Sequence, residues 1–174
     1  QTGVFNAYKI PLDGSPAQPL TDSKESIYVT GWFPKDDRVL YSADQGGNEE
    51  AHLYVRELDG SIKDLTPGEK HRAVFVSWHQ DNKQFFVASN ERDPKFFDVY
   101  RYQTSDYSRE LVFKNDRGLS VEDVSPDGQW VVGSKEHSNA NSDLFLFNLN
   151  TPNKEPVLVT EHQGDVSHGV YAFT

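Results

Sequence analysis

The chain has 174 residues, with 27 acidic and 17 basic side chains, a formal net charge of −10 and no cysteine. This acidity, without any run of clustered Lys and Arg, disfavours binding to nucleic acid or to an anionic membrane. The lack of cysteine excludes disulfides, cysteine-ligated zinc and a cysteine nucleophile from these residues.

Two short strands are predicted at the start of the chain, followed by three units of four strands and a single strand at the end. Each predicted strand is a short apolar run between turn-forming residues, which is typical of an antiparallel meander. The predicted ranges are 5–12 and 18–21; 27–33, 38–43, 52–58 and 62–66; 72–79, 84–89, 97–103 and 109–114; 119–125, 129–134, 143–149 and 156–160; and 169–173. The second strand of each unit is apolar without alternation, so we expect it to be covered on both faces.

The three units repeat one phrase at a constant interval. It reads WFPKDDRVLYS from Trp32, WHQDNKQFFVAS from Trp78 and VSPDGQWVVGS from Val124, so successive copies begin 46 residues apart. An internal period of this size indicates a stacked or radial repeat, and four strands per repeat favour the blades of a β-propeller over a sandwich. We therefore predict an all-β fold, a partial β-propeller of four-stranded antiparallel blades.

The phase of the repeat predicts how the blades divide the chain. We expect one propeller domain over 1–174, with complete blades at 23–68, 69–116 and 117–161 and part-blades at 1–22 and 162–174. Because the chain begins at Gln1 and both ends fall inside blades, we expect a fragment of a longer protein. Blade edges need a neighbour, so either further blades lie outside this numbering or two copies self-associate through their open blade edges.

Several motifs carry a resemblance that covers essentially the whole chain. They are Ser125-Pro126-Asp127-Gly128, Ser42-Ala43-Asp44 with Gly46-Gly47-Asn48, Leu53-Tyr54-Val55, Leu58-Asp59-Gly60 and Leu65-Thr66. Together they resemble the TolB-type propeller repeat. That repeat is shared by TolB and by the N-terminal propellers of the prolyl oligopeptidase family of serine peptidases, which includes acylaminoacyl peptidases and dipeptidyl aminopeptidases.

The resemblance implies a non-catalytic propeller module that gates the access of short peptides to a separate α/β-hydrolase domain. It implies that domain as a partner, a peptide substrate in passing, and an extracytoplasmic, periplasmic location. The nucleophile of the family lies in a G-x-S-x-G elbow C-terminal to the propeller. These residues contain no such motif, so we expect no catalytic residue, cofactor or metal here.

Two other functions are compatible with the same repeat. One is a free-standing TolB-like propeller that acts as a protein-protein interaction scaffold. The other is a polysaccharide lyase propeller, which would need a metal or a cluster of catalytic histidines and basic residues. Fold alone does not decide among the three.

Glu49 and Glu50 are the candidate substrate contacts. Some dipeptidyl peptidases of the family hold the amino terminus of a substrate with two propeller glutamates, and two carboxylates suit an ammonium group. The pair stands in a hairpin loop that occurs in every unit, so the alternative interpretation is a solvated turn.

Other polar residues are expected to be structural. Asp165, Ser167 and His168 have the side chains of a hydrolytic triad, but neighbours along a strand point to opposite faces, so we expect an ordinary loop. The six histidines lack metal-ligand spacing. The charged hairpin at Arg92 to Lys95 is a candidate for an interdomain salt bridge.

Overall fold

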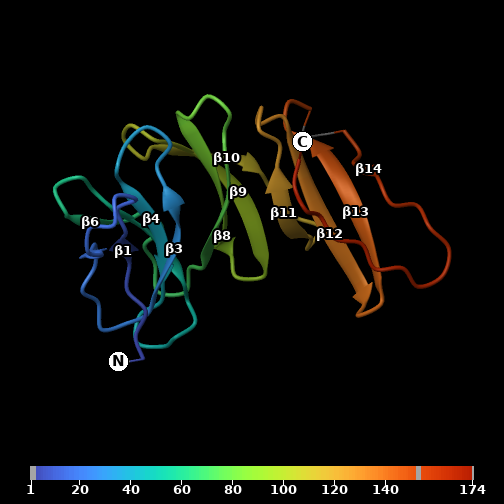
Figure 1. Cartoon of the computed structure of the whole chain (residues 1–174). Coiled ribbons are helices and arrows are strands. Elements are labelled where there is room, and N and C mark those ends of the chain that lie inside the picture. The colour runs from blue at the N-terminus through green and yellow to red at the C-terminus, as the bar shows by residue number, and fades with distance from the viewer. Residues whose placement is uncertain (1–2, 152–153, 174) are drawn as a thin grey trace. The chain divides into compact units, whose positions relative to one another are not determined.

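The computed structural model describes residues 3–151 and 154–173, and every regular element within them is a β-strand. A two-stranded sheet of β1 (Tyr8–Lys9) and β2 (Gln18–Pro19) comes first. Three four-stranded antiparallel sheets follow, each a meander in chain order (Figure 1). They are the first blade, β3 (Ile27–Trp32), β4 (Val39–Ala43), β5 (His52–Arg56) and β6 (Ile62–Asp64); the second blade, β7 (Ala73–Trp78), β8 (Gln84–Asp93), β9 (Phe96–Gln103) and β10 (Arg109–Phe113); and the third blade, β11 (Ser120–Val124), β12 (Trp130–Ser138), β13 (Asn141–Asn148) and β14 (Val157–Leu158).

The prediction of an all-β, partial β-propeller with four-stranded antiparallel blades is confirmed. The chain divides into two compact units, Gln1–Val74 and Phe75–Thr174, and the division falls inside β7. Among the described residues there is no helix of the length and apolarity that crossing a membrane requires.

The second strand of each blade forms its core. β4, β8 and β12 contain consecutive buried residues, as their continuous apolar sequences predict. Leu40, Phe85, Phe86 and Val131 are fully buried. Burial of one such side chain stabilises a fold by about 1.5 to 3 kcal/mol, so these three strands are a main source of hydrophobic stabilisation.

The tight turns between first and second strands form where the sequence predicts them. In the third blade Gly128 N donates to the Ser125 carbonyl at 2.7 Å, with a φ of 66° at Gly128. Asn82 has the same place in the second blade, with a φ of 59° and a bond of 2.9 Å to the His79 carbonyl. Glycine and asparagine enter the left-handed region at low cost, which explains why these residues stand here.

The first and third blades share one backbone irregularity. The pairing of β3 with β4 shifts between Val29 and Gly31, and the pairing of β11 with β12 shifts between Val121 and Asp123. Val29 and Val121 are separated by two repeat periods of 46 residues. A bulge increases the local twist of a strand, so both hairpins have the same twist built in at the same point.

A threonine after the fourth strand closes most of the repeats. Its hydroxyl accepts a hydrogen bond from a backbone N–H on the third strand: Thr21 from Ala7 at 2.9 Å, Thr66 from Leu53 at 3.0 Å and Thr160 from Leu144 at 2.8 Å. In the second blade Lys114 has this place in the sequence. There Asn115 N donates instead to Asp98 Oδ1, at 2.8 Å.

Within the second unit, the second and third blades pack through one apolar cluster. Phe86 and Val99 of the second blade join Val124 and Val131 of the third, and all four are buried. The Ser77 hydroxyl adds a hydrogen bond to the Val124 carbonyl at 3.0 Å. Side chains and backbone therefore both hold these two sheets together.

Two hairpins continue beyond their predicted ends. The β8–β9 ladder reaches the pair Asp93 and Phe96, and the β12–β13 ladder reaches Ser138 and Asn141. The polar sequence predicts loops at these positions. The strands persist because backbone bonds and polar contacts such as that of His137 Nε2 with Asp143 Oδ2, at 2.9 Å, replace apolar packing there.

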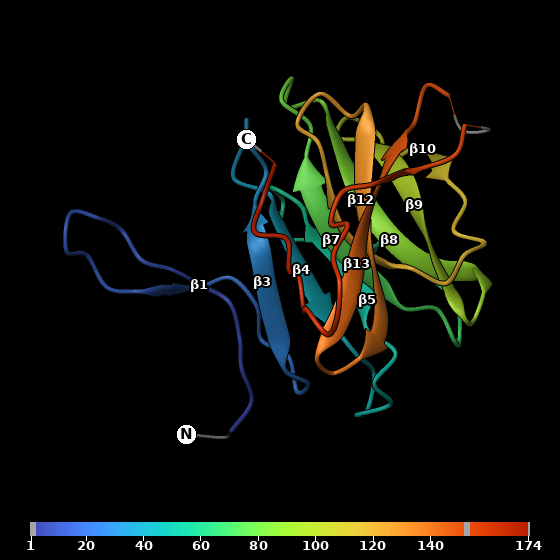
Figure 2. The ribbon, with the colours of Figure 1, turned by 90° about the vertical axis from the view of Figure 1, so that its right-hand side faces the viewer.

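The predicted strand at 169–173 is wrong. No strand follows β14 in the described residues, and the Phe173 N–H donates to Asp123 Oδ2 at 3.2 Å instead. A strand needs a partner that satisfies its backbone groups along its length, and this segment has only isolated bonds. At the other end β1 and β2 are shorter than predicted, and their hairpin reaches outward beside β3 (Figure 2).

Candidate functional site

The loop that carries the two candidate glutamates is ordered by its own polar side chains. Asn48 Oδ1 accepts hydrogen bonds from the backbone N–H of Gln45 at 3.3 Å and of Glu50 at 3.0 Å. Asp44 Oδ2 accepts one from Glu49 N at 3.2 Å. Glu49 has a φ of 62°, which is uncommon for a residue with a side chain. The loop between β4 and β5 is therefore a built turn that holds both glutamates in defined positions.

The side chains of the two glutamates have different surroundings. Glu49 is exposed and lines a pocket of about 330 Å3 together with Glu25 and Tyr28. Glu50 turns toward Arg72, whose Nε lies 3.5 Å from Glu50 Oε2. That oxygen is buried and has no hydrogen-bond partner among the described residues. One carboxylate is thus open to solvent, while the other lies beside a guanidinium group.

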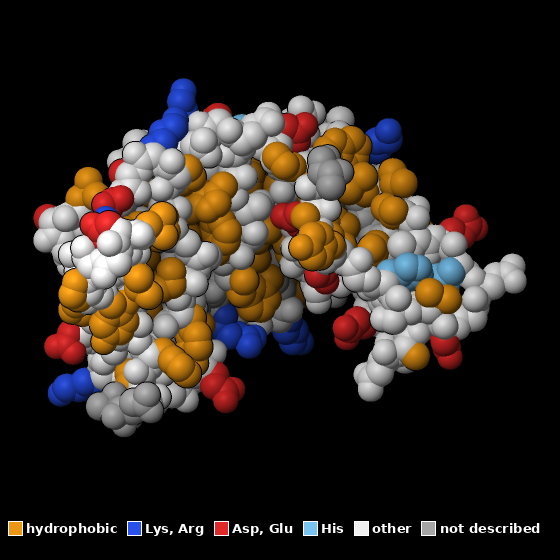
Figure 3. Space-filling model, in the orientation of Figure 1, with side chains coloured by type: hydrophobic (Ala, Val, Ile, Leu, Met, Phe, Trp, Pro, Cys, Tyr) orange, Lys and Arg blue, Asp and Glu red, His pale blue; other side chains and the backbone are white. Residues whose placement is uncertain are grey.

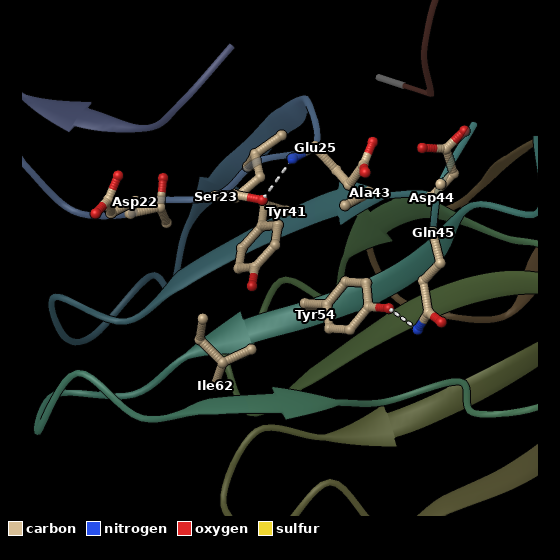
Figure 4. Close-up of a pocket in the computed structure, with 12 residues that line it drawn as sticks. Asp22, Ser23, Glu25, Tyr41, Ala43, Asp44, Gln45, Tyr54 and Ile62 are labelled. Carbon is tan, nitrogen blue, oxygen red and sulfur yellow. Dashed lines mark hydrogen bonds between the residues drawn. The ribbon is translucent and has the colours of Figure 1, made fainter. Parts of the chain in front are cut away.

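A larger pocket, of about 410 Å3, lies on the same blade (Figure 4). Tyr41 of β4 and Tyr54 of β5 form one wall, because they are direct partners in the ladder and their rings stack with centroids 5.4 Å apart. Ile27 and Ile62 add apolar surface. The pocket is therefore aromatic and aliphatic inside.

Tyr41 is almost completely buried, with 3% of its surface exposed, and its ring points toward Tyr54 and Ile62 (Figure 4). Its hydroxyl makes no hydrogen bond to a described residue, whereas the Tyr54 hydroxyl accepts one from Gln45 Nε2 at 3.2 Å. Burial, with Tyr54 and Asp64 nearby, raises the pKa of Tyr41 to about 12. Burial also raises the pKa of Tyr54. Both phenols are therefore neutral hydrogen-bond donors near neutral pH.

Three carboxylates lie around this pocket. Asp22, Glu25 and Asp44 line it, and none of the described lining residues is Lys or Arg. Carboxylates beside aromatic faces favour a cation electrostatically. We call this site the acidic pocket, defined by Tyr41 and Tyr54 with these three carboxylates.

His52, next to Tyr54 in the stacked aromatic group, has a structural role. Its Nδ1 lies 2.7 Å from Asp64 Oδ2 and its Nε2 lies 3.0 Å from the Gly68 carbonyl. The rings of His52 and Tyr54 stack with centroids 6.1 Å apart. Both imidazole nitrogens are thus engaged in joining β5 to the end of the blade.

The three triad-type residues near the end of the chain do not converge. Asn141 Nδ2 lies 3.1 Å from Asp165 Oδ1, and His168 Nδ1 lies 2.9 Å from the Ser142 carbonyl. Across the described segments, no hydrogen bond joins Asp165, Ser167 and His168 to one another. These contacts dock the segment on the start of β13.

Three histidines that are scattered in the sequence gather near Asp143. His137 Nε2 lies 2.9 Å from Asp143 Oδ2, and His162 Nδ1 lies 3.6 Å from Oδ1. The rings of His162 and His168 have centroids 5.0 Å apart. Among residues 3–151 and 154–173, however, no three His, Asp or Glu side chains are arranged to hold a metal ion. The cluster holds the segment after β14 against the third blade.

The charged hairpin of the second blade is tied to its own blade. Arg92 Nε lies 2.5 Å from Oδ2 of the fully buried Asp98, and Arg92 Nη2 lies 3.3 Å from Asp116 Oδ1. The hydrogen bond to Asp98 raises the pKa of Arg92 above its ordinary value. The guanidinium expected to form an interdomain salt bridge is therefore already engaged within the blade.

Reading the sequence did not identify the acidic pocket. Its Tyr41 and Tyr54 belong to neighbouring apolar strands, where an aromatic residue is most simply a core residue. The signal that could have found them is the hairpin register. Tyr41 lies two residues before Ala43 and Tyr54 two residues after His52, so the two tyrosines are partners once Ala43 and His52 are known to flank the loop.

A model of the prolyl oligopeptidase N-terminal β-propeller domain matches residues 23–171. Dipeptidyl aminopeptidase BIII of Pseudoxanthomonas mexicana is 35% identical over 122 residues, which cover 68% of this chain and 18% of that protein. The chain therefore spans less than a fifth of the length of this relative.

Solved structures share the fold at lower identity. TolB from Acinetobacter baumannii has a TM-score of 0.55 at 19% identity, covering 88% of this chain and 37% of TolB. An oligogalacturonate lyase in complex with manganese has a TM-score of 0.68 at 14% identity, covering 90% of this chain and 42% of the lyase. Likeness at this level concerns the fold and does not extend to activity.

Proposed function

The chain belongs to the family of prolyl oligopeptidase N-terminal β-propeller domains, and we propose that it gates the access of short peptides to a separate α/β-hydrolase domain. The family match over residues 23–171 is the observation that carries the proposal. The likeness to a dipeptidyl aminopeptidase supports a peptidase as the context of the propeller. In this function the chain acts by steric exclusion and positioning, while the hydrolase domain supplies the nucleophile.

The test compares the intact gene product with the 174-residue chain. We expect the gene product to hydrolyse dipeptidyl chromogenic substrates and to spare a folded protein substrate, and the chain alone to hydrolyse neither. Turnover by the chain alone that is lost when one of its own residues is changed would contradict the proposal. A gene product without a hydrolase domain would point instead to a TolB-like interaction scaffold.

We further propose that Glu49 and Glu50 contact the amino terminus of the peptide. The proposal is supported by the open carboxylate of Glu49 and by Glu50 Oε2, which is buried without a hydrogen-bond partner among the described residues. An ammonium group would supply the missing donor and would be held by charge-assisted bonds to both side chains.

The contact is tested with Glu49→Gln and Glu50→Gln in the intact gene product. Each change is expected to raise KM about tenfold or more for peptides with a free amino terminus, because a charge-assisted bond is lost. N-acetylated peptides should be unaffected. Glu69→Gln, at an exposed position outside the loop, is the matched control. An equal effect on free and acetylated peptides would remove the two glutamates from the site.

We also propose that copies of the chain associate through open blade edges. Large exposed apolar side chains gather in the first unit (Figure 3) and again after β13. Between Phe75 and Asn150, Leu111 is the only large apolar residue among those described that is exposed. Uncovered apolar surface of this kind favours association. Light scattering tests this point, since the mass of a single chain at high concentration would exclude it.

The blade boundaries at 23–68, 69–116 and 117–161, with part-blades at 1–22 and 162–174, are proposed on the same repeat. Each four-stranded sheet lies inside one of these ranges. Limited proteolysis should cut first between the first two ranges, where Glu69 and Lys70 are exposed.

A further inference from the structure

The acidic pocket has a counterpart two repeats later. The hairpins β3–β4 and β11–β12 pair in the same register, with Tyr28 opposite Ser42 and Ser120 opposite Ser134. The position equivalent to Ile27 is therefore that of Leu119, which lines a pocket of about 260 Å3 on the third blade. The pocket is thus a recurring feature of this repeat.

The counterpart stays open although another blade packs on the same face. Alternate residues of a strand share a face, so Val131 and Lys135 lie on one face of β12. Val131 belongs to the cluster with Phe86 of the second blade, while Lys135 lines the open pocket. In the first blade, Val39 and Ala43 correspond to Val131 and Lys135. A neighbouring blade that packs on Val39 would therefore leave the pocket beside Ala43 accessible.

The two pockets differ in charge at two equivalent positions. Glu25 of the acidic pocket corresponds to Arg117 of the counterpart, and Ala43 corresponds to Lys135. Of the aromatic wall, Tyr54 corresponds to Phe145 as the partner of the second strand, whereas Tyr41 corresponds to Gly133. The place of the pocket in the repeat is therefore kept while its lining changes, as expected if the two pockets take different ligands.

The Tyr41 hydroxyl gives a second and independent indication of a ligand. The Tyr41 side chain is 3% exposed, and its hydroxyl, which reaches the pocket, has no hydrogen-bond partner among the described residues. Its hydroxyl faces the pocket and is neutral, because its pKa is raised to about 12. A ligand that presents a carbonyl oxygen would satisfy it, whereas an anionic ligand would be repelled by Asp22, Glu25 and Asp44.

We propose that the acidic pocket binds a short peptide segment in which a Lys or Arg stands beside an apolar residue. The backbone carbonyl accepts a hydrogen bond from Tyr41, the apolar side chain contacts Ile27 and Ile62, and the cationic side chain lies among the three carboxylates. This site shares Glu25 and Asp44 with the smaller pocket that Glu49 lines, but neither Glu49 nor Glu50 lines it, and it does not depend on the gating function or on a hydrolase domain.

Binding is measured on the 174-residue chain by NMR with ring-labelled tyrosine, with the signals assigned from Tyr41→Phe and Tyr54→Phe. The probes are acetyl-Lys-Leu-amide and acetyl-Glu-Leu-amide, which differ in charge and lack free termini. We expect the lysyl peptide to shift the Tyr41 and Tyr54 signals saturably. The glutamyl peptide should bind about tenfold more weakly or less, because it meets like charges.

Two variants separate the contributions. Tyr41→Phe keeps the ring and removes the hydroxyl, so it should weaken the lysyl peptide about three- to tenfold, the value of one hydrogen bond. Glu25→Arg places the residue of the third blade in the first, and should abolish the preference for the lysyl peptide. Glu69→Arg makes the same change of charge at an exposed position outside the pocket and should leave binding unchanged.

The proposal is overturned if neither tyrosine responds, if both peptides shift the signals equally, or if Glu25→Arg retains the lysyl preference. Should Glu25→Arg fail to fold, Glu25→Gln is used, and it must still lose affinity for the lysyl peptide only. A peptidase assay of the intact gene product is unaffected by any of these results, so failure of the pocket and failure of the gate are distinguishable.

Discussion

Arg92 and Asp98 form the most buried ion pair among those described, with Arg92 Nε 2.5 Å from Oδ2 of a carboxylate that is 0% exposed. The other oxygen of Asp98 accepts the backbone N–H of Asn115 at 2.8 Å. The Asn115 side chain in turn donates to the Leu119 carbonyl at 2.7 Å. One buried carboxylate thus joins the β8–β9 hairpin to the connection that enters the third blade.

Asp98→Ala should therefore be among the most damaging single changes in this chain. It removes the nearer of the two carboxylates that contact Arg92 and leaves the buried N–H of Asn115 without an acceptor. A buried N–H left without a partner costs about 1 to 3 kcal/mol, and the cavity left by the Asp98 side chain adds to the loss. The free energy of unfolding in urea measures the effect.

Arg101→Ala is the matched control for Asp98→Ala. Arg101 pairs with Glu110 on the surface of the same blade, where both side chains are partly exposed. Such pairs contribute about 0.2 to 1 kcal/mol. A loss in Asp98→Ala no larger than in this control would mean that the carboxylate does not hold the blade together.

Thr66→Val tests the closing threonine of the first blade. The change keeps the shape of a fully buried side chain but removes the acceptor of Leu53 N. A buried N–H left without a partner costs about 1 to 3 kcal/mol. Thr66→Ser keeps the hydroxyl and should lose roughly 1 kcal/mol or less, the value of a methyl group. Hydrogen exchange should accelerate at the Leu53 amide in the valine variant alone.

The titration of Tyr41 predicts how stability depends on alkaline pH. Its pKa is raised from 10.0 to about 12 in the folded chain, first by burial and then by Tyr54 and Asp64. As the pH rises above 10, the unfolded chain loses this proton before the folded chain does, so the free energy of unfolding falls between pH 10 and about 12. Below pH 10 this group makes no pH-dependent contribution.

The ultraviolet difference spectrum of tyrosinate follows this ionisation directly. One late-titrating phenol should be absent in Tyr41→Phe, while Tyr54 and Tyr100, whose pKa burial also raises, remain. The alkaline loss of stability should be smaller in that variant. If the two titration curves coincide, Tyr41 does not ionise late and its hydroxyl is not shielded from water.

Gly128→Ala tests the packing of a turn against the neighbouring blade. A Cβ at Gly128 would lie 2.9 Å from Phe86 Cζ and 3.0 Å from His79 Cδ2, at a φ of +66°. Gly164 has a φ of +76° and open space around its Cβ position, so Gly164→Ala has the backbone cost alone. That cost is about 1 to 2 kcal/mol, and Gly128→Ala should exceed it by about 1 to 3 kcal/mol of overpacking. Equal losses in thermal unfolding would show that the contact relaxes freely.

Local sequence was sufficient to predict the blades, because short apolar runs and turn residues act over a few positions. The turn at Gly128 and the buried run at Phe85 and Phe86 needed no tertiary information. The ends of β8 and β12 could not be predicted without tertiary information, because their polar residues stay in the ladder through partners such as Asp98. The prediction of a strand at 169–173 was wrong for the converse reason: the segment has strand-like residues but no ladder partner among the described strands.

The candidate site was less predictable than the fold. Glu49 and Glu50 could be singled out as a pair, but their separation into an open carboxylate and one beside Arg72 depends on the loop backbone. The pairing of Tyr41 with Tyr54 depends on the hairpin register, which the chain sets through contacts that no local motif contains.

The shared bulge of the β3–β4 and β11–β12 hairpins has a consequence for engineering. Residues 27–43 and 119–135 have the same length, the same pairing and the same shift in register. Grafting one hairpin in place of the other should therefore exchange the side chains of two strands while the strand pairing stays the same. Because Glu25 and Arg117 lie just outside these segments, such a graft would carry Lys135 into the first blade while the three carboxylates of the acidic pocket stay in place.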